Sequence, residues 1–202
     1  MFVAVGLGPG DPELLTVRAV RLLKEADAVF VPGEVARAIV APYRTDATVL
    51  DFPMTDDESR IRRCMEENAE TIAPAARRGL AVFGLLGDPH FFGTASRLCA
   101  VLHERHPEIA YRTVPGISAI TAFASAAGID VNGGMCVSDG SVVDGRLLLK
   151  VTRPREAAAG LRKEGFSEFV LVERMFMEGQ MIYRNEDLPE KSPYFSVLFA
   201  RR

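Results

Sequence analysis

Short apolar runs alternate with amphipathic segments along the first half of the chain. The runs that predict strands lie at residues 2–5, 28–31, 48–50, 80–85 and 111–114. The segments with apolar side chains at helical spacing lie at residues 16–25, 34–39, 56–78, 94–104 and 119–127. This alternation of strands and helices favours an α/β fold built on a parallel sheet.

The second half continues the alternation but adds a polar, hairpin-like stretch. Its predicted elements are a strand at 146–151, a helix at 155–164, a strand at 168–173, the hairpin-like section at 175–184 and a last strand at 194–200. Because of this hairpin and an open C-terminal edge, we expect a mixed sheet. We place the boundary after Val114, which gives two small α/β domains, at 1–114 and 115–202.

Composition and charge exclude several classes of protein. The chain has 202 residues, 48% of them hydrophobic and 25% charged, which is ordinary for a globular protein. A net charge of −3 gives no electrostatic reason to expect nucleic acid as a partner. No apolar run approaches the roughly 20 residues that span a bilayer, so we expect no membrane association. The chain enters its first strand without a basic region or cleavage signal, and we expect a cytoplasmic protein.

The cysteines and histidines do not form a metal-binding pattern. Cys64, Cys99 and Cys136 are odd in number and widely spaced, and are expected to be reduced, buried or partly buried thiols. His103 and His106 have a spacing that resembles a ligand pair. They lie at a predicted helix end before a proline, where solvated histidines are the simpler interpretation. We expect no metal site.

Three loops rich in glycine and proline each follow an apolar strand and precede a helix. They are Gly8-Pro9-Gly10, Gly87-Asp88-Pro89 and Pro115-Gly116-Ile117-Ser118. In a parallel sheet, all three loops lie along the carboxyl edge, where glycine lets the backbone approach a ligand. Each loop alone is better explained as an ordinary turn. Three of them in equivalent positions favour a ligand-binding cleft.

The first loop does not fit a dinucleotide site. The G-x-G-x-x-G pattern places its third glycine one residue later than Gly10. That pattern also requires an acidic residue after the second strand, where this chain has Pro32-Gly33. No G-x-S-x-G or G-x-x-x-x-G-K-[ST] motif is present, which argues against hydrolase and P-loop chemistry.

The residues of the second loop have two interpretations each. Asp88 either caps the following helix or touches a polar ligand. His90 is either a hydrogen-bonding residue or a proton-transfer group. Phe91-Phe92 either line an apolar wall for a planar ligand or pack into the core.

Taken together, these motifs resemble the tetrapyrrole (corrin/porphyrin) methylases. The likeness is carried by the segments at 5–16 (VGLGPGDPELLT), 86–89 (LGDP) and 114–119 (VPGISA). Within that family the chain is most similar to the precorrin-2 / cobalt-factor II C20-methyltransferases. The points of likeness are residues 41–43 (APY), 52–55 (FPMT), 91–92 (FF) and 194–196 (YFS). The segment between Val31 and Ala41 is shorter than in C20-methylating members, which leaves the exact substrate open.

The resemblance implies a two-domain α/β homodimer that binds S-adenosylmethionine in the cleft between its domains, largely through main-chain groups. The residues implied to contact this cofactor are Pro9, Leu86, Gly87, Asp88, Phe91, Ser118 and Ala119. Val151 and Met175 occupy the corresponding positions of the second domain. The implied activity is C20 methylation of precorrin-2 or cobalt-factor II in cobalamin biosynthesis.

The residues suit such a reaction, because methyl transfer from a sulfonium requires alignment of the reactants and neither a metal nor a covalent enzyme intermediate. No catalytic side chain is assigned. Arg37, Arg97 and Arg153 either pair with carboxylates of the substrate or are ordinary surface arginines. Two alternatives remain open: a methylase of the same fold acting at another tetrapyrrole carbon or on protein or RNA, and a non-catalytic small-molecule binding module.

Overall fold

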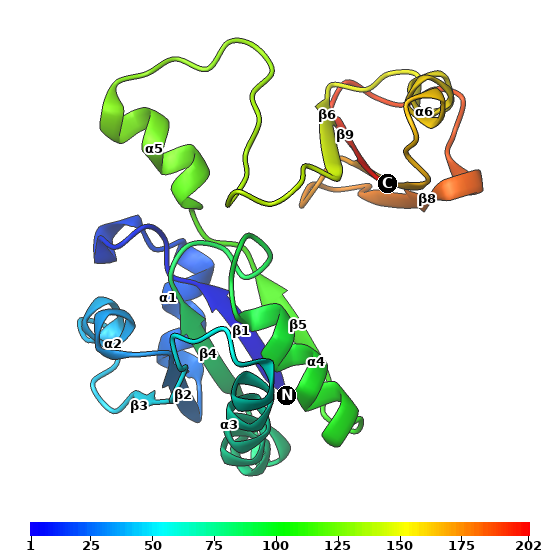
Figure 1. The fold of residues 1–202 in the computed structure, drawn as a ribbon. Helices are drawn as coiled ribbons and strands as arrows, with labels where there is room; N and C mark the ends of the chain where they lie inside the picture. Colours follow the sequence, from blue (N-terminus) through cyan, green and yellow to red (C-terminus); the bar gives the residue numbers. More distant parts are fainter. The chain divides into compact units, whose positions relative to one another are not determined.

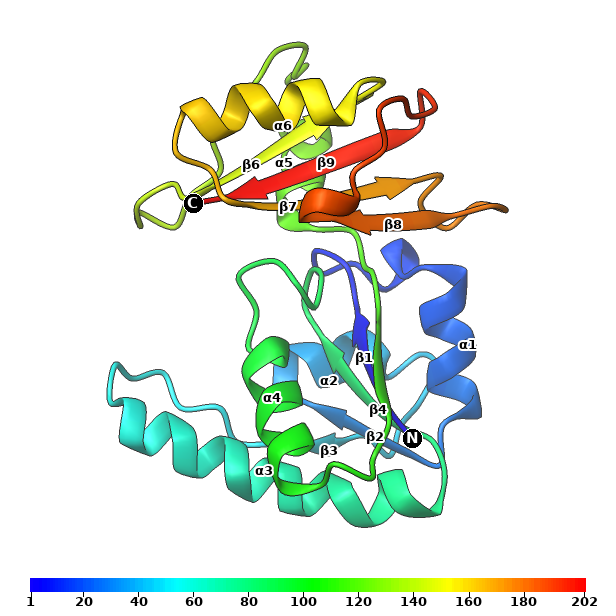
Figure 2. The same cartoon turned by 90° about the vertical axis from the view of Figure 1, so that its right-hand side faces the viewer.

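The computed structural model describes all 202 residues, which form two compact units, Met1–Met135 and Cys136–Arg202. The first unit is an α/β layer structure around a five-stranded parallel sheet of order β3-β2-β4-β1-β5 (Figure 1). Its strands are β1 Phe2–Gly6, β2 Ala28–Val31, β3 Thr48–Val49, β4 Ala81–Leu85 and β5 Tyr111–Val114. Its helices are α1 Val17–Glu25, α2 Glu34–Val40, α3 Glu58–Arg78, α4 Ala95–Arg105 and α5 Ala119–Ala127, with a 3-10 turn at Pro12–Leu14. Figure 2 shows α1 and α4 on opposite sides of the sheet.

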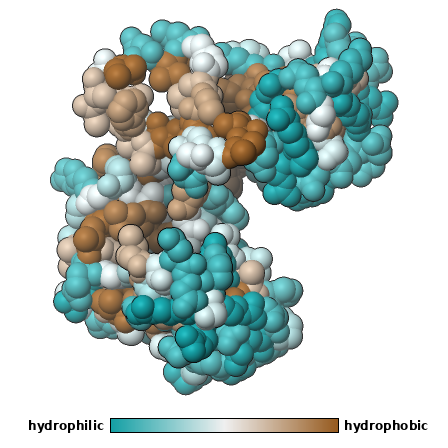
Figure 3. All heavy atoms as spheres, in the orientation of Figure 1, coloured by the Kyte–Doolittle hydropathy of each residue, from teal (hydrophilic) through white to brown (hydrophobic).

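Helix α5 differs from the other helices because none of its residues is buried. Its sequence is almost entirely apolar, and Phe123 is 59% exposed. Figure 3 shows hydrophobic residues gathered over α5. Packing therefore does not tie α5 firmly to the unit with which it is grouped, and the domain boundary after Val114 stays a prediction.

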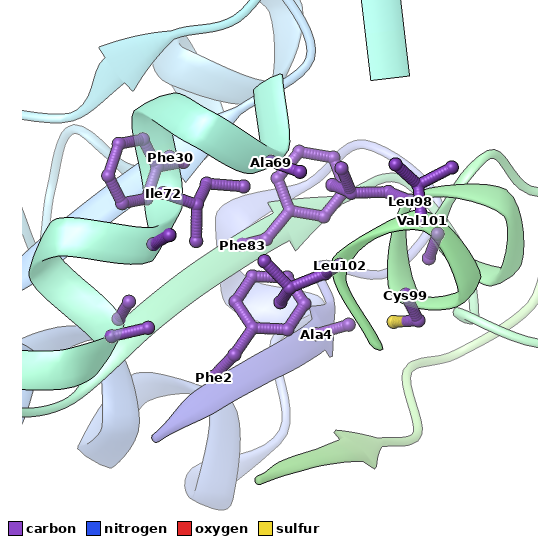
Figure 4. Packing of buried hydrophobic residues seen from close by; sticks show 14 of the residues in the cluster. Phe2, Ala4, Phe30, Ala69, Ile72, Phe83, Leu98, Cys99, Val101 and Leu102 are labelled. Carbon is purple, nitrogen blue, oxygen red and sulfur yellow. The ribbon is translucent and has the colours of Figure 1, made fainter. Parts of the chain in front are cut away.

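The sheet of the first unit is buried on both faces because its strand residues alternate between two cores. Phe2 and Ala4 of β1 belong to the cluster with α3 and α4, whereas Val3 and Val5 belong to the cluster with α1 and α2. Every residue of β1 and β4 is buried. In Figure 4 the side chains of Phe2 and Phe83 face those of the helices that cover them. Such two-sided burial is typical of parallel strands covered by helices.

Polar side chains cap the starts of helices α1 and α3 of this unit. Thr16 accepts a hydrogen bond from the backbone of Ala19 at 3.1 Å, at the start of α1. Asp57 accepts from the backbone of Ser59 and Arg60 at the start of α3. Each cap satisfies backbone N–H groups that have no partner within the helix.

The second unit is a four-stranded sheet of order β6-β9-β7-β8 with one helix. Its elements are β6 Gly145–Leu149, α6 Pro154–Lys163, β7 Glu168–Glu173, β8 Met181–Arg184, a 3-10 turn at Asn185–Asp187, and β9 Ser196–Arg201. Alternate residues of β7 and β9 pack with Ala158 and Leu161 of α6 in a separate core. No helix of either unit has the length and apolarity needed to cross a membrane.

The expected mixed sheet of the second half is wrong, because every neighbouring pair of strands there is antiparallel. Helix α6 connects β6 to β7 in the sequence. These two strands run in the same direction. Strand β9 inserts between them and pairs antiparallel with both. The expected α/β architecture and the parallel sheet of the first half are confirmed.

Candidate functional site

The three glycine-rich loops meet at the carboxyl edge of the first-unit sheet. The first and second loops are joined by backbone hydrogen bonds: Leu7 donates to Leu85 at 2.8 Å, and Gly87 donates to Gly8 at 2.7 Å. Gly8 and Gly87 thereby form an isolated antiparallel bridge beyond the parallel strands. The predicted convergence of the loops at one sheet edge is therefore confirmed.

Gly6 and Gly116 are required at this edge because backbone packs directly against backbone. A Cβ atom on Gly116 would lie 2.2 Å from the carbonyl oxygen of Gly87. A Cβ on Gly6 would lie 2.4 Å from that same oxygen and 2.5 Å from the Gly116 nitrogen. Side chains at these two positions would force the loops after β4 and β5 apart.

Gly87 is required for a different reason. Its φ of +68° lies in the left-handed region, which a residue with a side chain adopts only at a cost. A Cβ built on Gly87 meets no atom within 4 Å, so the residue borders open space. The half-buried Gly87 therefore leaves open space beside its backbone, and contact of this backbone with a ligand stays a prediction.

The side chain of Asp88 forms hydrogen bonds within the second loop and to the third loop. Asp88 is 8% exposed. Its Oδ1 accepts a hydrogen bond from the backbone of His90 at 2.9 Å, and its Oδ2 accepts one from the backbone of Gly116 at 3.2 Å. The interpretation of Asp88 as a helix cap is wrong, because α4 begins after Thr94. Contact with a ligand stays a prediction.

The other predicted residues of the first unit lie around the same loops. Leu86 and Phe91 are 43% and 52% exposed, so both offer apolar surface beside the glycine loops. Pro9 is half-buried in the first loop. Ser118 accepts a hydrogen bond from the backbone of Ile120 at 3.2 Å and begins α5, whose first residue is the exposed Ala119.

Val151 and Met175 lie in the second unit, at one end of its sheet. Each follows a strand that pairs with the start of β9: Leu149 and Val172 both face Val197 in the register. The side chains differ in burial, since Val151 belongs to the core and Met175 is 43% exposed.

Two residues that the sequence did not single out for chemistry lie at this same end of the second-unit sheet. Lys150 has a φ of +59°, and its Nζ lies 5.5 Å from the centre of the Tyr194 ring. A hydrogen bond with Tyr194 raises the pKa of Lys150. In the sequence, Lys150 falls near the end of the predicted strand at 146–151, a position that gives no sign of a functional role.

The arginines considered for substrate carboxylates have partners within the chain. Arg37 pairs with Glu34 at 2.6 Å, and Arg97 pairs with Glu58 at 3.1 Å. Arg153 pairs with Glu156 at 3.3 Å. These exposed pairs fit the interpretation of ordinary surface arginines. No cluster of three or more His, Cys, Asp or Glu side chains is placed to hold a metal ion.

Comparison with known proteins identifies relatives of this fold. The chain is 37% identical over 126 residues to a siroheme synthase of Nitrosomonas europaea, a match that covers 62% of this chain and only 26% of that protein. It is 34% identical over 135 residues to a Methanocaldococcus jannaschii protein named "Probable cobalt-precorrin-2 C(20)-methyltransferase", covering 63% of this chain and 56% of that one.

A solved structure has a similar fold. It is titled "Crystal structure of putative cobalamin synthesis related protein (CobF) from Corynebacterium diphtheriae", with a TM-score of 0.52, 17% identity, and coverage of 100% of this chain and 98% of that one. The family model of the Tetrapyrrole (Corrin/Porphyrin) Methylases matches residues 1–172. This match takes in the first unit with all three glycine loops and the second unit as far as Val172, and the chain belongs to the tetrapyrrole methylase family.

Proposed function

We propose that this protein transfers a methyl group from S-adenosylmethionine to a carbon of a tetrapyrrole. The observation that carries the proposal is the joining of three glycine-rich loops at one sheet edge, in a chain that belongs to the tetrapyrrole methylases. The loops offer backbone and few charged side chains, as expected of a site that positions a ligand already activated for reaction.

The residues of the first unit fit such a cofactor. The open space beside Gly87 lets a ligand reach the backbone, and Leu86 and Phe91 provide apolar surface for an adenine ring or a methylene chain. We propose that Pro9, Asp88, Ser118 and Ala119 complete this part of the site. Val151 and Met175 are the proposed contributors from the second unit.

S-adenosylmethionine carries its methyl group on a positively charged sulfur, and the neutral thioether that remains after the transfer is a good leaving group. The chain's part is to hold the cofactor by its backbone, to align the substrate carbon with the methyl group and to exclude water. The first and second loops are fixed to each other by main-chain hydrogen bonds, so the relative position of these two loops does not depend on a side chain. No covalent nucleophile is required.

We propose C20 methylation of precorrin-2 or cobalt-factor II as the specific reaction. The support is the set of motifs shared with C20-methyltransferases, together with the likeness to the Methanocaldococcus jannaschii protein of that name. The likeness to siroheme synthase supports a second candidate, methylation of another carbon of a tetrapyrrole. The match covers about a quarter of that siroheme synthase, so we do not propose the complete siroheme synthase activity for this chain.

The test is incubation of the purified protein with S-adenosylmethionine and, separately, precorrin-2, cobalt-factor II and other reduced tetrapyrroles. Mass spectrometry detects the added methyl group, and ¹³C NMR with a labelled methyl donor locates it. Methylation at C20 supports the proposal, and methylation elsewhere supports the second candidate. Cofactor binding without transfer to any tetrapyrrole contradicts both and favours a binding module.

A further inference from the structure

We propose that Glu173 is a positioning residue, whose carboxylate orders the segments of the second unit that carry Val151 and Met175. This inference rests on the proposed binding of S-adenosylmethionine. It concerns a buried acidic side chain to which the reaction itself assigns no role.

Glu173 is buried at the end of a strand that otherwise turns apolar side chains to the core. Phe169, Leu171 and Glu173 alternate along β7 on its buried face, and Glu173 is 9% exposed. Its cross-strand neighbour in β9 is Ser196, which is 1% exposed. The apolar core of this unit therefore ends in a buried polar pair.

A short chain of hydrogen bonds surrounds this carboxylate. The hydroxyl of Ser192 donates to Glu173 Oε1 at 2.6 Å, and Ser192 Oγ lies 2.7 Å from Ser196 Oγ. Ser196 in turn donates to the carbonyl oxygen of Pro193 at 2.6 Å. A buried carboxylate is costly unless hydrogen-bonded, and such a network favours one arrangement of the groups that it joins.

The network joins the three segments that meet at this end of the sheet. The backbone of Ser192 donates to Thr152 at 3.0 Å, next to Val151, and the backbone of Val151 donates to Ser196 at 3.1 Å. On the other side, the backbone of Arg174 donates to Phe195 at 2.7 Å. Glu173 is thus linked through Ser192 to the segment of Val151, and it directly precedes the turn that carries Met175.

The turn after Glu173 has a conformation that needs such support. Arg174 and Phe176 have φ values of +48° and +60°, in the left-handed region that side chains disfavour. Met175 lies between them and is 43% exposed, so little packing fixes its orientation. Strained backbone persists where surrounding contacts enforce it, and the hydrogen bonds around Glu173 are such contacts.

The test measures binding of S-adenosylhomocysteine by calorimetry to the wild type and to Glu173→Ala, Ser192→Ala and Glu173→Gln. Glu173→Gln keeps an oxygen that can accept from Ser192 and should bind like the wild type. Glu173→Ala and Ser192→Ala should raise Kd by about tenfold, because the site is less ordered before binding. Glu168→Ala, on the same strand but exposed and paired with Arg201, is the matched control and should leave Kd unchanged.

A second readout follows Met175 itself. With ¹³C-methyl methionine, the Met175 signal, assigned by its loss in Met175→Leu, should shift on ligand binding in the wild type and in Glu173→Gln. It should be broadened or displaced before binding in Ser192→Ala. Folded Glu173→Ala and Ser192→Ala variants that match the wild type in Kd and in this signal would overturn the positioning role. A wild type that binds no S-adenosylhomocysteine would instead overturn the proposed function on which this role rests.

Discussion

The carboxylate of Asp88 accepts a hydrogen bond from the backbone of Gly116 at 3.2 Å, across 28 residues of sequence. This contact joins the loop after β4 to the loop after β5. The first loop is joined to the second by backbone hydrogen bonds alone. Asp88 is therefore a side chain that links the third loop to the second.

Replacing Asp88 by Ala should lower both stability and cofactor affinity. Two backbone N–H groups lose a charged acceptor, which should reduce the free energy of unfolding by about 2 to 4 kcal/mol. The affinity for S-adenosylhomocysteine should also fall, because the loops after β4 and β5 are no longer joined by a side chain. Chemical denaturation and calorimetry measure the two effects.

Asp57→Ala is the matched control for this substitution. Asp57 also accepts hydrogen bonds from two backbone N–H groups, but it does so at the start of α3. Its loss should destabilise the protein and leave cofactor affinity in the folded fraction unchanged. Equal affinities of the Asp88 and Asp57 variants for S-adenosylhomocysteine would contradict a role of Asp88 in the cofactor site.

Gly87→Ala should mainly weaken cofactor binding, whereas Gly116→Ala should mainly destabilise the fold. At Gly87 the new Cβ points into open space and the cost of positive φ is about 1 kcal/mol, so folding should survive. Cofactor affinity should fall by about tenfold or more, because the methyl group occupies the approach to the backbone. At Gly116 the Cβ meets the Gly87 oxygen at 2.2 Å, which should destabilise the fold by at least about 3 kcal/mol. Thermal melting and calorimetry distinguish the two, and a stable Gly116→Ala protein would contradict the close packing.

The sequence predicted those features of this site that depend on local pattern. The bounds predicted for β5, which is followed by Pro115, and for α5, which is followed by Gly128, are those that the structure gives. The same pattern placed the three loops after parallel strands, and strand direction then required one common edge. Local pattern was sufficient because each loop directly follows its own strand.

Contacts between segments distant in sequence could not be predicted in this way. The role of Asp88 depends on the Gly116 nitrogen, and the burial of Glu173 depends on Ser192, 19 residues away. The antiparallel second sheet was missed for the same reason, because β9 comes from the end of the chain and separates β6 from β7. One sequence does not specify such pairings.

We predict a homodimer in solution. Helix α5 is apolar and has no buried residue, and such a surface favours association with another protein surface. Sedimentation equilibrium at micromolar concentration should give twice the monomer mass of 22.0 kDa. A Phe123→Asp variant should shift the equilibrium toward the monomer if α5 lies in the interface. A wild-type mass near that of the monomer would rule out the dimer.

Only one of the three thiols should react rapidly in the folded protein. Cys136 is exposed, whereas Cys64 and Cys99 are buried. Burial raises the pKa of Cys99 to about 11, and burial and the neighbouring Asp51 raise the pKa of Cys64. At pH 8 roughly one Cys99 thiol in a thousand would be the reactive thiolate, and this fraction grows only as the pH rises toward its pKa. A disulfide reagent should therefore titrate one fast thiol, lost in Cys136→Ser, and three in denaturant.

Removing all three thiols should leave the methyl transfer reaction intact. Cys64 and Cys99 lie in α3 and α4, and Cys136 lies in the exposed segment before β6, so none belongs to the glycine loops. A hydroxyl at the buried Cys99 site costs stability, and Cys99→Ala with Cys64→Ser and Cys136→Ser avoids this cost. The folded variant should keep its activity within about tenfold, or roughly 1.4 kcal/mol in the barrier. Asp88→Ala should cost more, because it separates loops that we propose hold the cofactor. A folded but inactive cysteine variant, beside a nearly normal Asp88→Ala, would contradict both the mechanism and the placement of the site.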